Sequence, residues 1–269
     1  MEYDPIKDRL GSLLDSRPRL LPILFGILDL LFLRTWYVHR VLRKLSLGPG
    51  SRLLDAGTGF GQYAWYVLRK YSGVSVTGID VKKDYLDRAA RCFLAFGLSD
   101  RVELLVDDVT KPKVKGAFDC ILAVDILEHI EADEVAIGHF SRRLLPGGRL
   151  IISTPSDQGG SDVKADGQSS FIGEHVRDGY NLGELTRKLE DAGLKIEESH
   201  YSYGPVGSAA WRMLIKVPML LLGRSLLLAP LVALYYIPVL PLGLSLNAVD
   251  LRRNNDAGTG LIVVARRET

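Results

Sequence analysis

The pattern of apolar and polar positions predicts a helical start to the chain. Residues 20–45 favour one long helix or a broken pair of helices. The first part of this segment, residues 20–33, is uncharged except for Asp29. A helix needs about 20 apolar residues to cross a bilayer, so this run is too short to span one.

Between Ser51 and Ile152, short apolar runs alternate with helical patterns. Strands that are buried on both faces have continuous apolar runs, and helices between them require parallel crossovers. This segment therefore predicts a doubly wound α/β sheet. Five strands are expected at 52–54, 74–79, 102–106, 119–124 and 149–152, and three helices at 60–71, 82–96 and 131–145.

The second half of the chain continues the same sheet around two unusual segments. Residues 154–174 are rich in Ser, Gly and Asp, and so long a loop is typical of a lid over a site or of a disordered segment; we favour a lid. A helix at 181–192 and strands at 194–201 and 259–267 follow, with an apolar insert before the last strand. The domain organisation expected is a helical segment over 1–46 and a single α/β domain over 47–269, with the insert at 205–249.

The insert contains 25 consecutive uncharged residues, 225–249. A single membrane span is excluded, because it would separate two strands of one sheet. Two crossings need about 40 residues and would place Lys216 and Arg224 inside the first leg. Three prolines are also expected to break any long helix here, namely Pro230, Pro238 and Pro241. We therefore expect a broken, interfacial or shallow re-entrant element, with an enlarged core or a dimer interface as the alternative.

Charge separates these apolar segments from the rest of the chain. The 269 residues are 47% hydrophobic and 25% charged, which excludes a disordered chain and a polytopic membrane protein. The net charge of +2 combines +5 over 16–46 and +4 over 205–253 with −7 elsewhere. Basic and apolar segments together favour an anionic membrane surface over nucleic acid. We expect 20–33 and 225–249 to form one contiguous apolar surface with a basic rim.

Cysteine content and the first residues bear on the compartment. The two cysteines, Cys92 and Cys120, exclude a disulfide scaffold and are expected in the core of a protein in a reducing compartment. The polar start, MEYDPIKDRL, is unlike a secretory signal. We expect a cytoplasmic protein that is peripheral or monotopic on a membrane.

The strongest chemical signal is a glycine-rich turn after the first predicted strand, LLDAGTGFG over 53–61. Glycines at such a turn let a ligand approach the backbone closely. The spacing is G-x-G-x-G, unlike a dinucleotide turn, and no G-K-[ST] of a P-loop follows. Asp55 before the turn would repel a phosphate but suit an ammonium group, and Asp80 at the tip of the next strand can accept ribose hydroxyls. This combination favours S-adenosylmethionine.

With these residues, 51–153 resembles the core of the class I S-adenosylmethionine-dependent methyltransferases. The resemblance is strongest to the branch of the ubiquinone, menaquinone, small-molecule and lipid methyltransferases. It rests on LLDAGTGFG, on GID ending in Asp80, on VDDV at 106–109, on FDCILAVDILEHI at 118–130 and on LPGGRL at 145–150. It implies a seven-stranded sheet with an antiparallel last strand. It also implies cofactor contacts from Asp55, Gly57, Thr58, Gly59, Gly61, Asp80, Val81, Asp108, Val109 and Asp125.

The resemblance also suggests roles for the residues near the acceptor. Asp108 aligns better than Asp107 with the acid that contacts the adenine amino group. His129 and His175 are candidate bases for a hydroxyl acceptor, although His129 can instead have a structural role. Tyr180 is a third candidate, expected to face the pocket together with Arg177.

A metal site is considered because of the arrangement Asp125-x-x-Glu128-His129. It resembles the Glu-x-x-Glu-His magnesium site of ubiquinone O-methyltransferases. The first ligand here is the shorter Asp, so we expect no bound Mg²⁺.

The predicted function is methyl transfer from S-adenosylmethionine to an apolar small molecule, such as a quinone precursor, isoprenoid or lipid, at a membrane surface. One alternative is a methyltransferase for a soluble small molecule, with the insert as a dimer interface. Another is a non-catalytic, membrane-bound assembly factor, which the intact glycine turn disfavours. A nucleic-acid methyltransferase is not expected, because no Asn/Asp-Pro-Pro-Tyr motif follows the fourth strand and the core is acidic.

Overall fold

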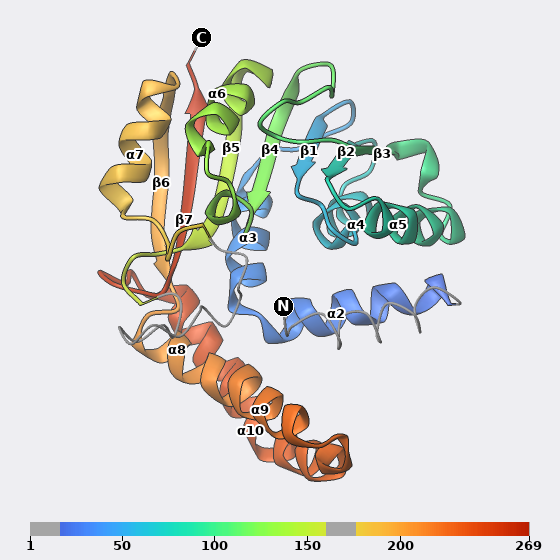
Figure 1. Ribbon diagram of the computed structural model, residues 1–269, viewed down its shortest axis with the longest axis vertical. Helices are drawn as coiled ribbons and strands as arrows, with labels where there is room; N and C mark the ends of the chain where they lie inside the picture. The colour runs from blue at the N-terminus through green and yellow to red at the C-terminus, as the bar shows by residue number, and fades with distance from the viewer. Residues whose placement is uncertain (1–16, 160–175, 269) are drawn as a thin grey trace.

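The computed structural model describes residues 17–159 and 176–268, which are built around one seven-stranded sheet (Figure 1). The strands lie in the order β3-β2-β1-β4-β5-β7-β6, and β7 runs antiparallel to both of its neighbours. The predicted doubly wound fold with a reversed last strand is confirmed. The strands are β1 (Arg52–Ala56), β2 (Ser75–Asp80), β3 (Val102–Val106), β4 (Phe118–Val124), β5 (Leu144–Pro155), β6 (Leu194–Ser202) and β7 (Gly260–Arg267).

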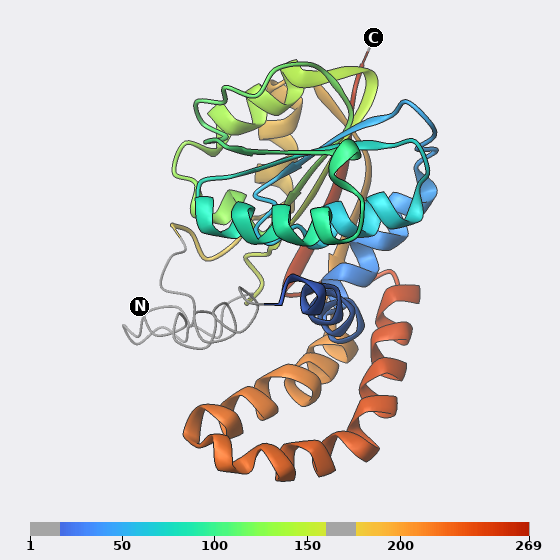
Figure 2. The ribbon, with the colours of Figure 1, turned by 90° about the vertical axis from the view of Figure 1, so that its right-hand side faces the viewer.

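Helices cover both faces of the sheet, as Figure 2 shows from the side. Alternate strand residues face the two layers, so that Leu53 packs into one core and Leu54 into the other. One face is covered by α3 (Leu33–Lys44), α4 (Gln62–Lys70) and α5 (Lys83–Ala95), and the other by α6 (Asp133–Arg143) and α7 (Leu182–Asp191). Short 3₁₀ turns are η1 (Pro18–Leu20), η2 (Ser99–Arg101) and η3 (Leu127–His129).

Both cysteines lie inside these cores. Cys92 and Cys120 are free and buried, and burial raises the pKa of each thiol. Their burial confirms the expectation that both are core residues. A raised pKa also leaves little of the reactive thiolate.

The N-terminal segment is the broken pair of helices. Helices α2 (Leu21–Leu31) and α3 meet at 94°, because Phe32 between them has an extended backbone. Side chains of α3 satisfy carbonyls freed by the break: Trp36 Nε1 donates to the Asp29 carbonyl at 2.8 Å, and Thr35 Oγ1 to the Phe32 carbonyl at 2.7 Å. The break lets α2 cross α4, where Phe25 packs on Trp65.

The insert is a helical hairpin that projects from the carboxyl edge of the sheet (Figure 2). Its first leg contains α8 (Pro205–Trp211), the π-helical turn η4 (Arg212–Lys216) and α9 (Val217–Arg224), and its second η5 (Leu226–Leu228) and α10 (Ala229–Arg252). The prediction that prolines break this segment was wrong. Pro230 lies in the first turn of α10, where no amide partner is needed. Pro238 and Pro241 lie inside α10, which bends and continues.

Buried polar contacts fix the base of the hairpin to α3. The carboxylate of Asp250 is fully buried and accepts hydrogen bonds from the Tyr37 hydroxyl at 2.9 Å and the Gly207 amide at 3.0 Å. The Arg40 guanidinium donates to the Leu251 carbonyl. The hairpin is therefore anchored to the N-terminal helices at its base.

Length and composition alone would allow two helical segments of the described chain to cross a membrane, Pro205–Arg224 and Leu226–Arg252. The bent pair from Pro18 to Lys44 would be a third if it counted as one span. Figure 1 shows that α2 and the hairpin leave the sheet edge in different directions. The expected contiguous apolar surface stays a prediction.

The predicted lid lies mostly outside the described residues. Strand β5 ends at Pro155, and of the loop 154–174 the structure describes only 154–159. The lid therefore stays a prediction.

Candidate active site

The glycine turn joins β1 to α4 at the carboxyl edge of the sheet. Gly57 has φ +71°, and a side chain there would overlap Ile126. Gly61 has φ +85°, and an added Cβ would lie 2.8 Å from Phe93. Only glycine fits both positions without strain. The amides of Gly57 and Thr58 donate to the Ile79 carbonyl, at 2.8 and 2.9 Å, which fixes the turn against β2.

Asp55, near the end of β1, is hydrogen-bonded to the turn. Its carboxylate is buried and accepts a hydrogen bond from Thr58 Oγ1 at 2.6 Å. Burial raises the pKa of this carboxyl to about 6, against the opposing effect of the Thr58 hydrogen bond. A buried carboxylate of raised pKa gains most from a cationic ligand group, which agrees with the expected ammonium contact.

Asp80 connects this turn to the next one. Its Oδ2 accepts the Gly59 amide at 2.9 Å, and its Oδ1 accepts the Lys82 amide at 2.8 Å. Each carboxylate oxygen has a second lone pair, so Asp80 can still accept two ligand hydroxyls. Val81 beside it is exposed, although it is apolar. The structure thus brings together Asp80, Val81 and the glycine turn, as predicted.

The two acids after β3 have different environments. Asp107 is buried and accepts the amides of Asp108, Lys113 and Val114, so it holds its own loop together. Asp108 is exposed, accepts from Thr110, and has its pKa lowered by those hydrogen bonds. Val109 beside it is partly buried. Only the Asp108 carboxylate is accessible to a ligand, which agrees with choosing it over Asp107.

Asp125, at the end of β4, has a strained backbone with φ +50°. Its amide donates to the Ser153 carbonyl at 2.8 Å, and its carboxylate forms an ion pair with Arg34 of α3. Such strain in a residue other than glycine is typical of functional sites. Sequence reasoning missed Arg34, which lies 91 residues away in the chain.

The carboxyl end of β4 continues into Glu128 and His129. Glu128 is buried, its Oε2 accepts from Thr154 Oγ1 at 3.1 Å, and burial raises its pKa. His129 is partly buried beside it. No cluster of three His, Cys, Asp or Glu side chains suited to a metal ion occurs within 17–159 and 176–268.

The N-terminal helices bring further polar groups to the glycine turn. Asp29 Oδ1 accepts from Gln62 Nε2 at 2.7 Å, and Gln62 follows the turn directly. The Arg34 amide donates to the Tyr203 hydroxyl at 3.2 Å. Asp29, the one acid within 20–33, was the only sequence signal for this contact.

Three buried polar atoms near these contacts have no hydrogen-bond partner in the described structure: Arg34 Nε, His39 Nε2 and Tyr63 Oη. Burial raises the pKa of Tyr63, and burial together with Arg43 lowers the pKa of His39 to about 4. Buried donors are normally paired. No ligand can reach these atoms directly, whereas the open lone pairs of Asp80 and the exposed Asp108 carboxylate fit a polar cofactor without phosphate.

The residues predicted to follow the lid lie against the segment after β4: the Val176 amide donates to the Glu128 carbonyl at 3.0 Å, and the Tyr180 hydroxyl lies 3.2 Å from the Leu127 carbonyl. The Tyr180 side chain is fully buried, and its hydroxyl lies 2.6 Å from Asp133 Oδ2. Arg177 and Lys188 pair with the same carboxylate, at 2.6 and 2.8 Å. This buried network favours structural roles for Tyr180 and Arg177 over contact with the acceptor. His175 lies outside the described residues.

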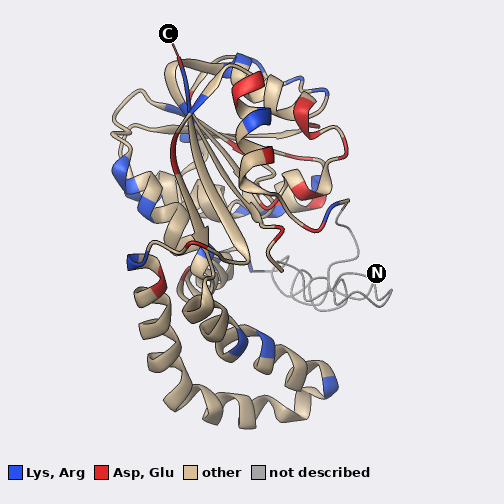
Figure 3. Cartoon of the chain, turned by 90° about the vertical axis from the view of Figure 1, so that its left-hand side faces the viewer, with Lys and Arg blue, Asp and Glu red and all other residues tan. Residues whose placement is uncertain are grey.

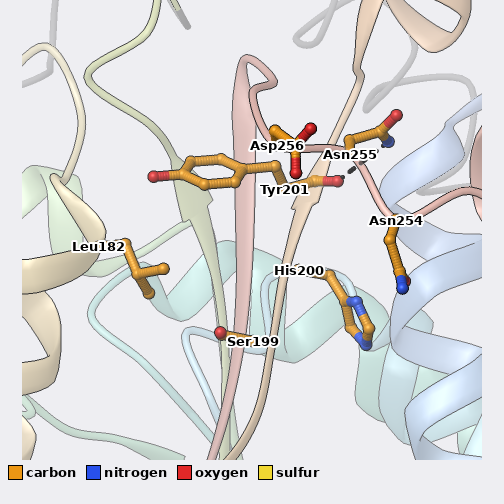
Figure 4. Close-up of a pocket in the computed structure, with 7 residues that line it drawn as sticks. All are labelled: Leu182, Ser199, His200, Tyr201, Asn254, Asn255 and Asp256. Carbon is orange, nitrogen blue, oxygen red and sulfur yellow. Dashed lines mark hydrogen bonds between the residues drawn. The ribbon is translucent and has the colours of Figure 1, made fainter.

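An open depression of about 410 Å³ lies along β6, the outermost strand (Figure 4). Strands β4, β5 and β7 separate it from the glycine turn. It is lined by Leu182, Ser199, His200, Tyr201, Asn254, Asn255 and Asp256. Figure 4 shows these side chains spread around the strand rather than converging on one point. The depression is therefore separate from the candidate site.

Known proteins share this arrangement. The model of the methyltransferase domain family matches residues 32–199. Phosphoethanolamine N-methyltransferase 1 of Arabidopsis thaliana is 34% identical over 160 residues, covering 56% of this chain and 30% of the relative. The ubiquinone/menaquinone biosynthesis C-methyltransferase UbiE of Syntrophotalea carbinolica is 32% identical over 149 residues, covering 55% and 59%. The match thus spans less than two thirds of either relative.

Among solved structures, the [4+2]-cyclase SpnF aligns with a TM-score of 0.60 at 25% identity, covering 86% of this chain and 80% of that one. A cyclase on this fold shows that the fold alone does not fix the reaction. The family match covers more than half of the chain and includes the complete glycine turn and Asp80. The chain therefore belongs to the class I methyltransferase family, whose cofactor is S-adenosyl-L-methionine.

Proposed function

We propose that this protein transfers the methyl group of S-adenosylmethionine to an apolar small molecule at a membrane surface. A quinone precursor, an isoprenoid or a lipid would suit such a site. The observation that carries the proposal is the placement of two features at one edge of the sheet. The glycine turn opens at the carboxyl ends of the strands, and the exposed apolar hairpin projects from the same edge (Figure 1).

The names of the two relatives point to acceptors of different polarity. One relative is named for ubiquinone/menaquinone biosynthesis, and the other for phosphoethanolamine, which is charged and water-soluble. Neither name fixes the acceptor of this chain, because each match covers only part of the relative. The exposed apolar helices are the feature of this chain that favours an apolar acceptor over a soluble one.

Residues of the site divide the work of holding the cofactor. Asp80 would accept the ribose hydroxyls, Asp108 the adenine amino group, and the glycine turn with Asp55 would receive the ammonium group. When bound, the cofactor supplies a methyl group already activated on a sulfonium. The protein then mainly holds donor and acceptor in line at short distance.

The reaction breaks the bond between sulfur and the methyl carbon and forms a bond from the acceptor to that carbon. A hydroxyl acceptor also loses a proton, and a base must accept it. The candidate bases are His129 and His175, of which only His129 lies among the residues that the structure describes. A carbon acceptor needs a base only after transfer. Exclusion of water from the site would favour dispersal of the sulfonium charge.

The test is mass spectrometry of apolar extracts from cells with and without the protein. We expect one apolar species to be 14 Da lighter in cells that lack it, and the native mass to return with the intact gene. Cells that carry only Asp80→Ala should keep the lighter species. Asp87 pairs with Lys83 on α5, outside the site, so Asp87→Ala should restore the native mass. Unchanged apolar extracts alongside a 14-Da shift in a water-soluble compound would overturn the proposed acceptor class.

A further inference from the structure

The distal part of the hairpin is apolar on both its inner and its outer face. Val232, Tyr235 and Tyr236 face the first leg. On the outer side Leu227 is 89% exposed and Ile237 is 71% exposed, and Leu231 and Leu234 are also exposed. A helix that is apolar all round is normally buried in a core or in a membrane, so this part of the chain needs an apolar partner.

Side chains of the second leg satisfy the backbone of the first leg where Pro218 disrupts it. Pro218 has no amide hydrogen, so the carbonyls four and five residues before it, those of Leu214 and Met213, lose that donor. The hydroxyl of Tyr236 donates to the Leu214 carbonyl at 2.6 Å, and that of Tyr235 to the Met213 carbonyl at 3.1 Å. Internal satisfaction of backbone polar groups is what a hydrocarbon environment requires.

All charge that the hairpin exposes is positive (Figure 3). Its cations are Arg212, Lys216, Arg224 and Arg252, and its one acid, Asp250, is buried at the base. A second copy of the chain that packed through the same hairpin face would bring the same positive charge to the interface. Anionic lipid headgroups complement it, so the charge favours a bilayer as the partner.

The positions of the cations limit the depth of insertion. Arg224 is exposed and lies two residues before the apex at Leu226. Upright insertion of the first leg would therefore carry this cation about 12 Å deeper than Lys216 at 1.5 Å per residue, close to the middle of a hydrocarbon core of about 30 Å. If both legs crossed the bilayer, Arg212 and Lys216 would lie within the hydrocarbon, which is costly. The bend in α10 also turns its first half across the long axis of the molecule (Figure 2).

We propose that the hairpin inserts into one leaflet of an anionic bilayer and does not cross it. Residues 226–238 lie in the plane of the membrane among the upper acyl chains. Arg212, Lys216 and Arg252 lie at the level of the headgroups, and the long side chain of Arg224 reaches up to the same level. The sheet stays on one side, with its carboxyl edge toward the lipid. This inference rests on the membrane part of the proposed function, and its test does not use methyl transfer.

The first test measures depth with spin labels on the full-length protein. Both native thiols are buried, so labels can be placed on single engineered cysteines, Leu227→Cys and Ile237→Cys. Val135→Cys, an exposed apolar position on α6, is the matched control. In vesicles of phosphatidylglycerol and phosphatidylcholine, the first two labels should be accessible to oxygen, protected from a water-soluble nickel chelate, and at similar depth within the outer leaflet. The control label should remain accessible to the chelate.

The second test measures charge dependence. Replacing both Arg212 and Lys216 by Gln should lower the partition onto anionic vesicles about 30-fold, since each cation near such a surface contributes about 1 kcal/mol. Partition onto pure phosphatidylcholine should change little. The matched control replaces Lys70 and Lys195, both exposed and remote from the hairpin, and should leave both partitions unchanged.

Three results would overturn the inference. A Leu227→Cys label that reacts with a reagent trapped inside the vesicles would show that the hairpin crosses the bilayer. Labels that stay in water beside vesicles, in a protein that is dimeric in solution, would assign the face to a second copy. Equal partition of the Gln variant and the parent would remove the charge argument. Methyl transfer to a soluble acceptor beside these results would leave the catalytic part of the proposed function intact.

Discussion

The glycine turn and the hairpin lie at the same edge of the sheet but are built on opposite principles. At the turn, polar atoms have fixed partners at short distance: Asp55 holds Thr58, and Asp80 holds the amides of Gly59 and Lys82. On the distal hairpin, large apolar side chains such as Leu227 face outward and are not covered by any of the residues that the structure describes. The polar groups of the turn are satisfied by the chain itself and by one small ligand. The apolar side chains of the hairpin need a large apolar partner. The two regions should therefore respond differently to mutation.

The largest effect on cofactor binding is expected at Gly57. Substitution by Ala forces a side chain into Ile126 at a φ that only glycine adopts easily, and strain of about 1–3 kcal/mol plus this overlap should weaken S-adenosylmethionine binding roughly 100-fold. Calorimetry measures the change. Gly97→Ala is the control, because Gly97 has φ +66° but open space around it. This variant should have a similar backbone strain and bind S-adenosylmethionine normally. Equal loss of binding in both variants would refute a site-specific role for Gly57.

Stability should depend on pH through Asp55. Because its pKa is raised to about 6 in the folded protein, the folded state binds this proton more tightly than the unfolded chain. Its contribution to stability therefore falls as pH rises from about 4 to about 6, by about 3 kcal/mol in all. Asp55→Asn removes the ionisation and keeps an acceptor for Thr58, so the variant should gain on the parent across this window. Urea unfolding of the cofactor-free proteins measures it, and a constant difference from pH 4 to 7 would contradict the assignment.

A smaller effect is expected at Asp80. Asp80→Ala removes the acceptor for two backbone amides and for the ribose, which should weaken cofactor binding by about 1–3 kcal/mol. Partition onto anionic vesicles should not change, because Asp80 lies outside the hairpin. Calorimetry and vesicle sedimentation on the same preparation compare the two regions directly, with Asp87→Ala as the control. Loss of both activities together would mean that the variant misfolds and that the two regions are not independent.

The smallest effect concerns the hairpin backbone. Tyr236→Phe removes the 2.6 Å hydrogen bond to the Leu214 carbonyl and should cost about 1 kcal/mol of unfolding free energy. Tyr235→Phe removes a longer bond of 3.1 Å and should cost less. Thermal unfolding ranks the two variants. A reversed order would show that hydroxyl capping does not explain how the chain tolerates Pro218.

The sequence predicted the turn better than the hairpin, for a physical reason. The contacts of Asp55 and Asp80 follow from residues close in the chain and from the order of parallel strands, so motif spacing is enough to place them. Arg34 meets Asp125 across 91 residues, and no local pattern announces that contact. The sequence left Tyr180 free to reach the acceptor, because its neighbours Asp133 and Lys188 are far from it in the chain. Only the fold brings these three residues together. In α10 the prolines bend the helix without ending it, so the propensity of single residues was a poor guide.

The central claim joins the two regions: the turn provides the methyl donor and the hairpin gives access to an apolar acceptor. The direct measurement incubates the full-length protein with methyl-labelled S-adenosylmethionine and anionic vesicles loaded with apolar extract from cells that lack the protein. We predict label in the organic phase for the parent and for Asp87→Ala, and little for Asp80→Ala. Label confined to the aqueous phase, when soluble cell extract is supplied in parallel, would contradict the account.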